Sequence, residues 1–360
     1  MSDPIPFSSL DLEAALLSNL ADIGYAEMTL VQAETLPHLL GGADVLARAK
    51  TGSGKTAAFG LGLLHRLDAS RFRSQALVLC PTRELADQVS KEIRRLARTI
   101  GNVKILTLCG GVPLGPQLAS LQHSPHVIVG TPGRVLKHLR QGTVALGELK
   151  TLVFDEADRM LDMGFADELN AILEFLPRDR QTLLFSATYP DSIAAISKRV
   201  QRDPVIVDVT DDEQPAHIEQ RWCSVTRENR NPELVRALRA WGGALNLVFC
   251  NTKVDCAEVA DYLNSEKIVA VALHGDLDQG ERNEVLVRFA NRSAVVLVAT
   301  DVAARGLDVK DLDAVFNYEL PRQPEVYIHR IGRTGRAGKQ GVAVSLVEQR
   351  EEWRWQGIEA

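Results

Sequence analysis

Short apolar runs alternate with longer amphipathic stretches along almost the whole chain. Most of the apolar runs lack the alternation of apolar and polar residues that marks a half-exposed strand. Such runs are typical of parallel strands that are buried on both faces. The strands predicted in this way are Val45–Ala47, Ala76–Cys80, Lys104–Leu108, Val127–Val129, Thr151–Phe154, Thr182–Phe185, Val205–Val209, Ile218–Val225, Leu245–Phe249, Val269–Leu273, Val295–Ala299, Ala314–Asn317 and Val342–Val347.

The segments between these strands have the spacing of amphipathic helices. In Glu84–Thr99, for example, the apolar residues Leu85, Val89, Ile93 and Leu96 recur at intervals of three or four residues. Because strands and helices alternate, the pattern predicts parallel sheets with helices on both faces, the doubly wound α/β class.

One polar segment interrupts this alternation. Residues 210–217 contain three acidic residues and a proline but no apolar run, which is typical of a linker. A chain of 360 residues is long enough for two domains. We therefore expect two doubly wound domains, residues 1–209 and 218–360, joined by the short linker 210–217 and separated by a cleft.

Composition and charge exclude several classes of protein. With 45% apolar and 24% charged residues, the chain resembles neither a disordered nor a collagen-like protein. The net charge is −6, so a nucleic-acid partner would have to bind a local surface rather than a generally basic molecule. There is no C-x-x-C pair among the five cysteines, no signal-peptide pattern, and no apolar run of the ~18 residues that a membrane span needs. We expect a cytoplasmic protein without membrane contact.

A glycine-rich segment follows the first predicted strand and precedes a predicted helix. Its glycines let backbone N–H groups turn inward around phosphate oxygens at the start of the helix. We expect Lys55 to reach the β- and γ-phosphates of a nucleotide and the Thr56 hydroxyl to bind Mg²⁺. The predicted phosphate-binding residues are Ala49, Thr51, Gly52, Ser53, Gly54, Lys55 and Thr56.

An acidic run lies about 100 residues further on, where the predicted strand Thr151–Phe154 ends in Asp-Glu-Ala-Asp. An acid at the carboxyl end of a strand, beside a phosphate loop, can hold Mg²⁺, and we assign this role to Asp155. We expect the adjacent Glu156 to orient and deprotonate the attacking water. Together with the phosphate loop, this run predicts hydrolysis of a nucleoside triphosphate.

The run Asp155–Asp158 resembles the motif that names the DEAD-box RNA helicases. The sequences of Ala49–Leu64 and Gln75–Val89 most resemble those of the bacterial DbpA group of that family. That group acts on large-subunit ribosomal RNA and carries a C-terminal RNA-recognition domain, which has no counterpart before Ala360; the chain is expected to be a truncated core or a short relative. The other segments that match, in the family's order, are Gly24-Tyr25 with Gln32, Pro81–Leu85, Gly110-Gly111, Thr131–Arg134, Ser186–Thr188, Val248–Thr252, His274–Asp276, Ala299–Asp308 and His329–Arg336.

The resemblance implies two RecA-like domains that bind ATP and RNA across their cleft. Gln32 would select adenine, Tyr25 would stack on it, and Asp308 would contact the ribose. Arg333 and Arg336 of the second domain would act as arginine fingers, so that hydrolysis requires the domains to close.

The same resemblance implies an RNA path and a coupling segment. Ser186 and Thr188 would couple the state of the nucleotide to strand separation. The residues that would contact RNA are Thr82, Arg83, Gly111, Thr131, Arg134, Gly275 and Thr300. These are hydroxyls, glycine N–H groups and arginines, which position a backbone and do not read bases.

We therefore expect an ATP- and Mg²⁺-dependent, monomeric RNA helicase that acts on ribosomal RNA. Disrupting a base-pair step costs about 1.4 kcal/mol, so one closure of the domains would open only a short duplex. Local, non-processive unwinding follows. Two alternatives remain open: an ATP-gated clamp that holds RNA without unwinding it, and a DNA helicase or translocase.

Overall fold

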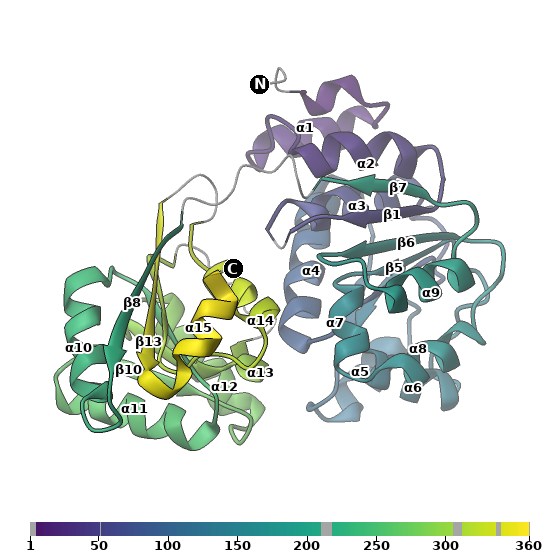
Figure 1. Ribbon diagram of the computed structural model, residues 1–360. Coiled ribbons are helices and arrows are strands. Elements are labelled where there is room, and N and C mark those ends of the chain that lie inside the picture. The colour runs from purple at the N-terminus through teal and green to yellow at the C-terminus, as the bar shows by residue number, and fades with distance from the viewer. Residues whose placement is uncertain (1–4, 51, 210–217, 305–311, 336–339, 360) are drawn as a thin grey trace. The chain divides into compact units, whose positions relative to one another are not determined.

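The computed structural model describes residues 5–50, 52–209, 218–304, 312–335 and 340–359. The chain divides into two compact units, Met1–Gln214 and Pro215–Ala360, each with its own sheet (Figure 1). The segment 210–217, which we predicted to be a linker, lies outside the described residues.

The first unit is built on a seven-stranded parallel sheet with the order β3-β4-β2-β5-β6-β1-β7. Every residue of β2, β4, β5 and β6 is buried, as the continuous apolar runs predicted, whereas β7 at the sheet edge is partly exposed. The strands are β1 (Val45–Arg48), β2 (Ala76–Leu79), β3 (Ile105–Leu108), β4 (Val127–Gly130), β5 (Thr151–Phe154), β6 (Gln181–Ser186) and β7 (Val205–Asp208).

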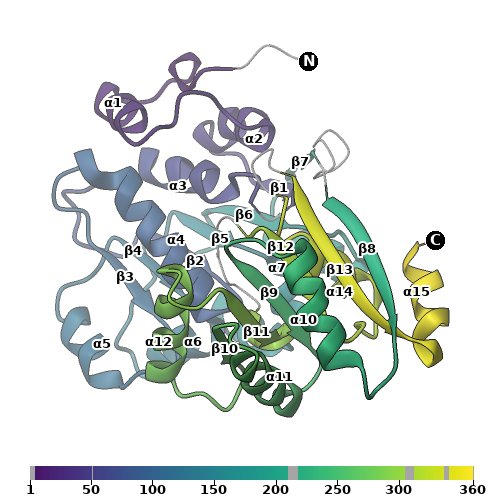
Figure 2. The ribbon, with the colours of Figure 1, turned by 90° about the vertical axis from the view of Figure 1, so that its left-hand side faces the viewer.

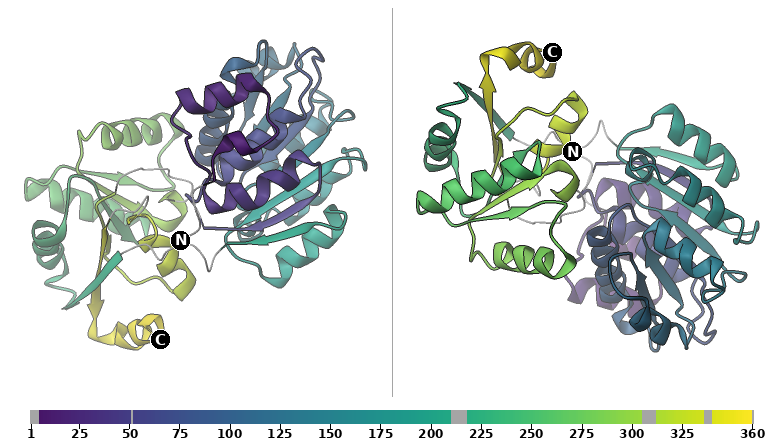
Figure 3. Two further views of the ribbon diagram at one scale, coloured as in Figure 1. Left: turned by 90° about the horizontal axis from the view of Figure 1, so that it is seen from above. Right: turned by 90° about the horizontal axis from the view of Figure 1, so that it is seen from below.

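Helices cover both faces of this sheet (Figure 3). Side chains of successive strand residues enter two separate cores: Val78 and Val153 face one, whereas Leu77 and Leu152 face the other. The helices are α1 (Ala14–Asp22), α2 (Leu30–Leu40), α3 (Lys55–His65) and α4 (Arg83–Leu96) on the first core, and α6 (Pro132–Arg140), α7 (Ala157–Asp162), α8 (Ala166–Leu173) and α9 (Asp191–Val200) on the second, with α5 (Leu114–Leu121) after β3. Short 3₁₀ turns lie at Phe7–Ser9 and Ala97–Thr99.

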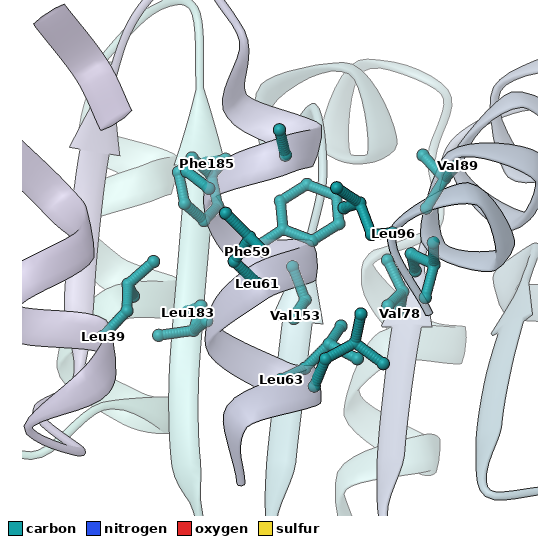
Figure 4. Close-up of a cluster of buried hydrophobic side chains, with 14 of the residues drawn as sticks. Leu39, Phe59, Leu61, Leu63, Val78, Val89, Leu96, Val153, Leu183 and Phe185 are labelled. Carbon is teal, nitrogen blue, oxygen red and sulfur yellow. The ribbon is translucent and has the colours of Figure 1, made fainter. Parts of the chain in front are cut away.

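Helix α3 lies at the centre of the first core. Its Phe59 is fully buried, with its ring 5.4 Å from that of Phe185 on β6, and Leu61 and Leu63 of the same helix are buried beside it (Figure 4). A fully buried side chain of this size stabilises the fold by about 1.5–3 kcal/mol. This packing fixes α3, and with it the glycine-rich loop at its start.

The second unit has a six-stranded parallel sheet with the order β10-β11-β9-β12-β13-β8. The edge strand β8 runs beside β13 and is largely exposed (Figure 2). The strands are β8 (Ile218–Val225), β9 (Asn246–Cys250), β10 (Ala270–Leu273), β11 (Val296–Thr300), β12 (Ala314–Asn317) and β13 (Gly341–Glu348). The helices are α10 (Arg230–Trp241), α11 (Lys253–Ser265), α12 (Gln279–Ala290), α13 (Asp301–Ala304), α14 (Pro324–Ile331) and α15 (Glu352–Glu359), with a 3₁₀ turn at Gln349–Glu351.

The doubly wound parallel class is thus confirmed in both units. Each predicted strand is present, and each of its ends differs from the prediction by no more than one residue. The helix predicted from Glu84 ends at Leu96, and a 3₁₀ turn takes the rest of that segment. Among the described helices, none has the length and apolar character needed to cross a membrane.

Candidate active site

Most of the predicted site residues of the first unit follow the carboxyl ends of its strands. The phosphate loop follows β1, Thr82 follows β2, Gly111 follows β3, Thr131 follows β4 and Asp155 follows β5. Because all these strands are parallel, their carboxyl ends meet at one edge of the sheet, where ligands of such folds bind. The fold therefore brings motifs that are far apart in sequence to a common edge.

The phosphate loop has its turn already formed. Gly52 and Gly54 have φ angles of 91° and 98°, values that favour glycine, and Gly54 leads directly into α3. Lys55 is buried, and its Nζ donates to the carbonyl of Ala49 at 2.7 Å. Ser53 closes the loop by donating from its hydroxyl to the carbonyl of Lys50 at 2.9 Å. Thr51 lies outside the described residues.

Gln32 ties the start of α2 to this loop. Its side chain is 1% exposed. Its Oε1 accepts from the N–H of Thr29 at 2.9 Å in a capping box, and its Nε2 donates to the carbonyl of Gly54 at 3.1 Å. A Cβ at Gly54 would lie 2.5 Å from that Nε2, so glycine is required for this approach.

Tyr25 is directed at α4. Its hydroxyl donates to Oε1 of Glu92 at 2.8 Å, and the guanidinium of Arg95 lies 5.6 Å from the centre of its ring. Burial, together with the negative charge of Glu92, raises the pKa of Tyr25. The ring also meets Phe7 edge to face at 5.9 Å. The adenine-stacking role of Tyr25 stays a prediction.

The two acids at the end of β5 are both buried. Burial raises the pKa of Asp155 to about 7, against the opposing effect of the Lys55 ammonium. Glu156 has a φ of 52°, in the left-handed region that is uncommon for a residue with a side chain. Its Oε2 lies 2.7 Å from Nη1 of Arg159, a buried ion pair that sequence reasoning did not foresee.

The last residue of the acidic run holds the Ser186-Ala187-Thr188 segment. Oδ2 of Asp158 accepts from the N–H of Ala187 at 3.1 Å and from both the N–H and the hydroxyl of Thr188 at 2.9 Å. Burial alone would raise the pKa of Asp158, but these hydrogen bonds outweigh it and lower that pKa. The hydroxyl of Ser186 is buried and has no hydrogen-bond partner among the residues that the structure describes. The predicted coupling segment is thus directly bonded to the acidic run.

The predicted RNA-contacting residues of the first unit come together in one group. The guanidinium of Arg83 occupies the space where a Cβ of Gly111 would lie, and Gly111 has a φ of 73°. Thr82 precedes α4 and accepts from the N–H of Leu85 at 3.3 Å. We call Thr82, Arg83, Gly111, Thr131 and Arg134 the hydroxyl–arginine cluster.

Arg134 belongs to this cluster through α6, which begins directly after Thr131. Its Nη2 donates to the carbonyl of Val112 at 2.9 Å, so the segment after β3 contacts the helix that follows β4. Thr131 in turn donates its N–H to the carbonyl of Leu108 at 3.1 Å. The cluster therefore spans the carboxyl ends of β2, β3 and β4.

In the second unit, Gly275 and Thr300 lie at the ends of neighbouring strands. β10 and β11 pair in parallel, with Leu273 opposite Ala299, so Gly275, two residues after the end of β10, and Thr300, the last residue of β11, lie at the same edge of the sheet. The hydroxyl of Thr300 accepts from the N–H of Ala303 at 3.3 Å. Arg333 is buried just after α14, whereas Asp308 and Arg336 lie outside the described residues.

Arg330 is a junction of the second unit that the sequence did not reveal. The side chain is 1% exposed, and Nε and Nη2 donate to the two carboxylate oxygens of Asp301 at 2.7 Å each. The same guanidinium donates to Asn251 at 2.9 Å and to Asn317 at 3.2 Å. Three of the matching segments are joined by this one side chain, because Asn251, Asp301 and Arg330 belong to different ones.

Comparison with known proteins identifies the family to which the chain belongs. Residues 29–196 match the family described as DEAD/DEAH box helicase, and residues 231–338 match the helicase conserved C-terminal domain. ATP-dependent RNA helicase DbpA of Escherichia coli (strain K12) is 58% identical over 349 residues, which cover 97% of this chain and 76% of that protein. The chain belongs to the DEAD-box ATP-dependent RNA helicases. As a DEAD-box protein it hydrolyses ATP and binds RNA, which decides against a DNA helicase.

Other relatives agree with this membership. DEAD-box ATP-dependent RNA helicase CshA of Bacillus anthracis is 44% identical over 354 residues, covering 98% of this chain and 67% of that protein. The structure of S. cerevisiae Dbp5 bound to RNA and ADP BeF3 matches 98% of this chain and 92% of that one, with 31% identity and a TM-score of 0.89. A DEAD box protein from Methanococcus jannaschii is 39% identical, with coverage of 99% and 96% and a TM-score of 0.57. The predicted family, fold and enzyme class are confirmed.

Proposed function

We propose that this DEAD-box helicase opens short RNA duplexes locally, one closure at a time, and does not translocate along a strand. The observation that carries this proposal is the bonding of Asp158 to Ala187 and Thr188, which attaches the coupling segment directly to the acidic run. A change at the nucleotide thereby reaches that segment without an intermediate element. Each base-pair step costs about 1.4 kcal/mol to disrupt, so one closure of the domains opens only a few base pairs.

Each part of the first unit has a place in this cycle. Gln32 selects adenine, with Tyr25 stacking on it, and the phosphate loop with Lys55 holds the phosphates. Glu156 is the general base. The donors at Thr56 and Asp155 are a hydroxyl and a carboxylate oxygen, the ligands that Mg²⁺ takes together with substrate phosphates, so these residues fit that ion. When bound, Mg²⁺ would neutralise negative charge on the phosphates.

The second unit completes the catalytic set in this proposal. Arg333 and Arg336 supply positive charge to the transferring phosphoryl group, and Asp308 contacts the ribose. Charge of this kind is worth about 10³–10⁵ in turnover in related nucleotide hydrolases. A chain that ends at residue 209 should therefore bind ATP weakly and show no RNA-stimulated hydrolysis.

The catalytic assignment is tested by replacing Glu156 with glutamine. The change keeps the size of the side chain but removes the base, so turnover should fall by about 10²–10⁴ while ATP and RNA still bind. Lys55→Ala should instead weaken nucleotide binding itself in a fluorescent-nucleotide titration. Glu174→Gln, an equivalent change on an exposed residue, serves as the control. Normal steady-state hydrolysis by Glu156→Gln would exclude Glu156 as the base.

For RNA, the hydroxyl–arginine cluster, with Gly275 and Thr300, supports recognition of the sugar-phosphate backbone. We propose a monomeric, cytoplasmic enzyme that takes part in assembly of the large ribosomal subunit, on the strength of its similarity to E. coli DbpA. The described core should nevertheless be indifferent to RNA sequence. The net charge of −6 on the whole chain provides little long-range attraction, so half-maximal RNA should be on the order of micromolar.

ATPase activation by a ribosomal RNA hairpin, an unrelated hairpin and a homopolymer tests this indifference at one salt concentration. A preference for the ribosomal hairpin above about tenfold, or ~1.4 kcal/mol, would show that the core reads sequence. A duplex-release assay run beside an RNA-retention assay tests the proposed unwinding: retention without release would mean that the protein is an ATP-gated clamp. Sedimentation at several concentrations tests the monomeric state.

A further inference from the structure

We propose that Gln117 is a positioning residue for RNA binding, which holds the guanidinium of Arg134 in place for a backbone phosphate. This inference rests on the proposed contact between Arg134 and RNA and adds a residue that no motif of the sequence contains. Gln117 lies in α5, between the glycine pair after β3 and the start of α6. Its side chain is 7% exposed, so it does not bind RNA itself.

The Gln117 amide joins three segments of the chain. Its Oε1 accepts from Nη1 of Arg134 at 2.7 Å and from Nε2 of His138 at 2.9 Å, and its Nε2 donates to the carbonyl of Cys109 at 3.0 Å. The residue after Cys109 begins the glycine pair that contacts Arg83. One buried amide thus fixes Arg134 relative to the loop that carries Gly111.

The orientation of this amide is determined by its partners. If its oxygen and nitrogen were exchanged, Nε2 would face the Arg134 and His138 donors, and Oε1 would face the carbonyl of Cys109. The contacts with the Arg134 guanidinium, which only donates, and with the Cys109 carbonyl, which only accepts, would then become repulsive. Both lone pairs of Oε1 are used as it stands, which leaves the side chain no alternative position at similar energy.

His138 supplies the second donor in a form that suits this role. Burial, together with the nearby charges of Arg134 and Lys137, lowers its pKa, so the imidazole is neutral at pH 7. Nδ1 lies 2.8 Å from the hydroxyl of Thr143 and Nε2 lies 2.9 Å from Oε1 of Gln117, so the tautomer with its proton on Nε2 donates to Gln117. A neutral donor at this place adds no positive charge beside Arg134.

Arg134 keeps donors for a phosphate after these contacts. Gln117 and the carbonyl of Val112 take one N–H group each from its two terminal nitrogens. A guanidinium has five N–H groups, so three are not used by these two contacts with described residues. Because the side chain is already fixed at two points, its ordering is not a cost of RNA binding.

The test is a double-mutant cycle between Gln117 and Arg134 in the full chain, read as the RNA concentration that half-maximally activates the ATPase. Gln117→Leu has a similar size but makes none of the three hydrogen bonds. Releasing one long side chain should raise half-maximal RNA by about 3- to 10-fold. In the Arg134→Ala background the same change should have less than a twofold effect. Turnover at saturating RNA and the KM for ATP without RNA should stay unchanged.

Gln122→Leu provides the matched control, because Gln122 lies at the exposed end of the same helix and should leave half-maximal RNA unchanged. If Gln117→Leu does not fold, as judged by amide protection in β4, Gln117→Glu carries the same cycle. The glutamate keeps both acceptor contacts, but its charge neutralises Arg134 and should raise half-maximal RNA only where Arg134 is present.

The outcomes separate the two levels of the argument. If Arg134→Ala leaves RNA activation unchanged, the proposed contact between Arg134 and RNA is wrong, and the inference fails with it. If Arg134→Ala weakens activation but the Gln117 variants have no effect, or the same effect in both backgrounds, the inference alone is overturned. Failure of both Gln117 variants to fold would also overturn it, since Gln117 would then serve the fold alone.

Discussion

Replacing Asp158 with asparagine should release the Ser186-Ala187-Thr188 segment from the acidic run. The carboxylate accepts three hydrogen bonds from Ala187 and Thr188 on Oδ2 and one from the N–H of Arg159 on Oδ1, at 3.0 Å. An asparagine oxygen can face only one of these two sides, so its NH₂ group must meet a donor on the other.

The size of the effect follows from these contacts. A hydrogen bond to a charged group contributes about 1.5–3 kcal/mol and a neutral one about 1 kcal/mol, so loss of the charge over three bonds weakens the attachment by about 1.5–6 kcal/mol. Local opening becomes more frequent by the same free energy, which corresponds to amide exchange at least about 10-fold faster. Thr188→Val removes one bond to the carboxylate and should weaken the attachment by about 1.5–3 kcal/mol.

Hydrogen–deuterium exchange read by mass spectrometry measures this directly. Peptides that contain Ala187 and Thr188 should lose protection in Asp158→Asn, whereas peptides from β2, in the centre of the same sheet, should not. Protection of Ala187 and Thr188 that changes by less than about threefold, which is ~0.65 kcal/mol, would refute the claim that Asp158 holds this segment. RNA-stimulated ATP hydrolysis should be lost in Asp158→Asn with ATP binding retained.

Two further predictions concern stability. Arg330→Met removes one partner of a buried ion pair and should destabilise the second unit by about 3–5 kcal/mol. Tryptophan fluorescence reports on this unit, because all four tryptophans lie in it, and the urea midpoint of its unfolding should be lower. An unchanged midpoint would contradict this prediction. The lowered pKa of His138 means that the unfolded chain binds this proton more readily than the folded one, so the stability of the first unit should be full above about pH 6.5 and fall as the pH drops below it. Urea unfolding followed by circular dichroism should show a weaker pH dependence in His138→Gln, and equal slopes in the two proteins would exclude His138 as the source.

The strands could be predicted closely because their signal is local. A parallel strand with helices on both faces is apolar along its length. The end of Thr151–Phe154 is visible in the sequence because the acidic run Asp155–Asp158 follows it directly. The same is true of the phosphate loop, where a backbone with positive φ at Gly52 and Gly54 needs glycine. A motif whose residue types determine its own backbone conformation can be predicted from a single sequence.

The residues that sequence reasoning missed share a different property. Gln117 and Arg330 are polar side chains buried by contacts with partners elsewhere in the fold. In sequence each has the appearance of a surface residue on an amphipathic helix. Only the pairing of distant segments, such as α14 with the ends of β9 and β11, supplies the groups that make burial of Arg330 favourable. The burial of such residues becomes readable only once the topology is known.

The double attachment of Gln32 limits how far nucleotide preference can be altered by one substitution. The same amide that we assign to adenine closes the capping box of α2 and holds the carbonyl of Gly54. A residue chosen at position 32 for another base would also detach the loop around the phosphates, and a larger residue at position 54 would displace the amide. Under the role proposed for Gln32, a substitution that alters the preference for the base therefore also alters the affinity for the phosphates. A change of nucleotide would need coordinated replacements at positions 32 and 54.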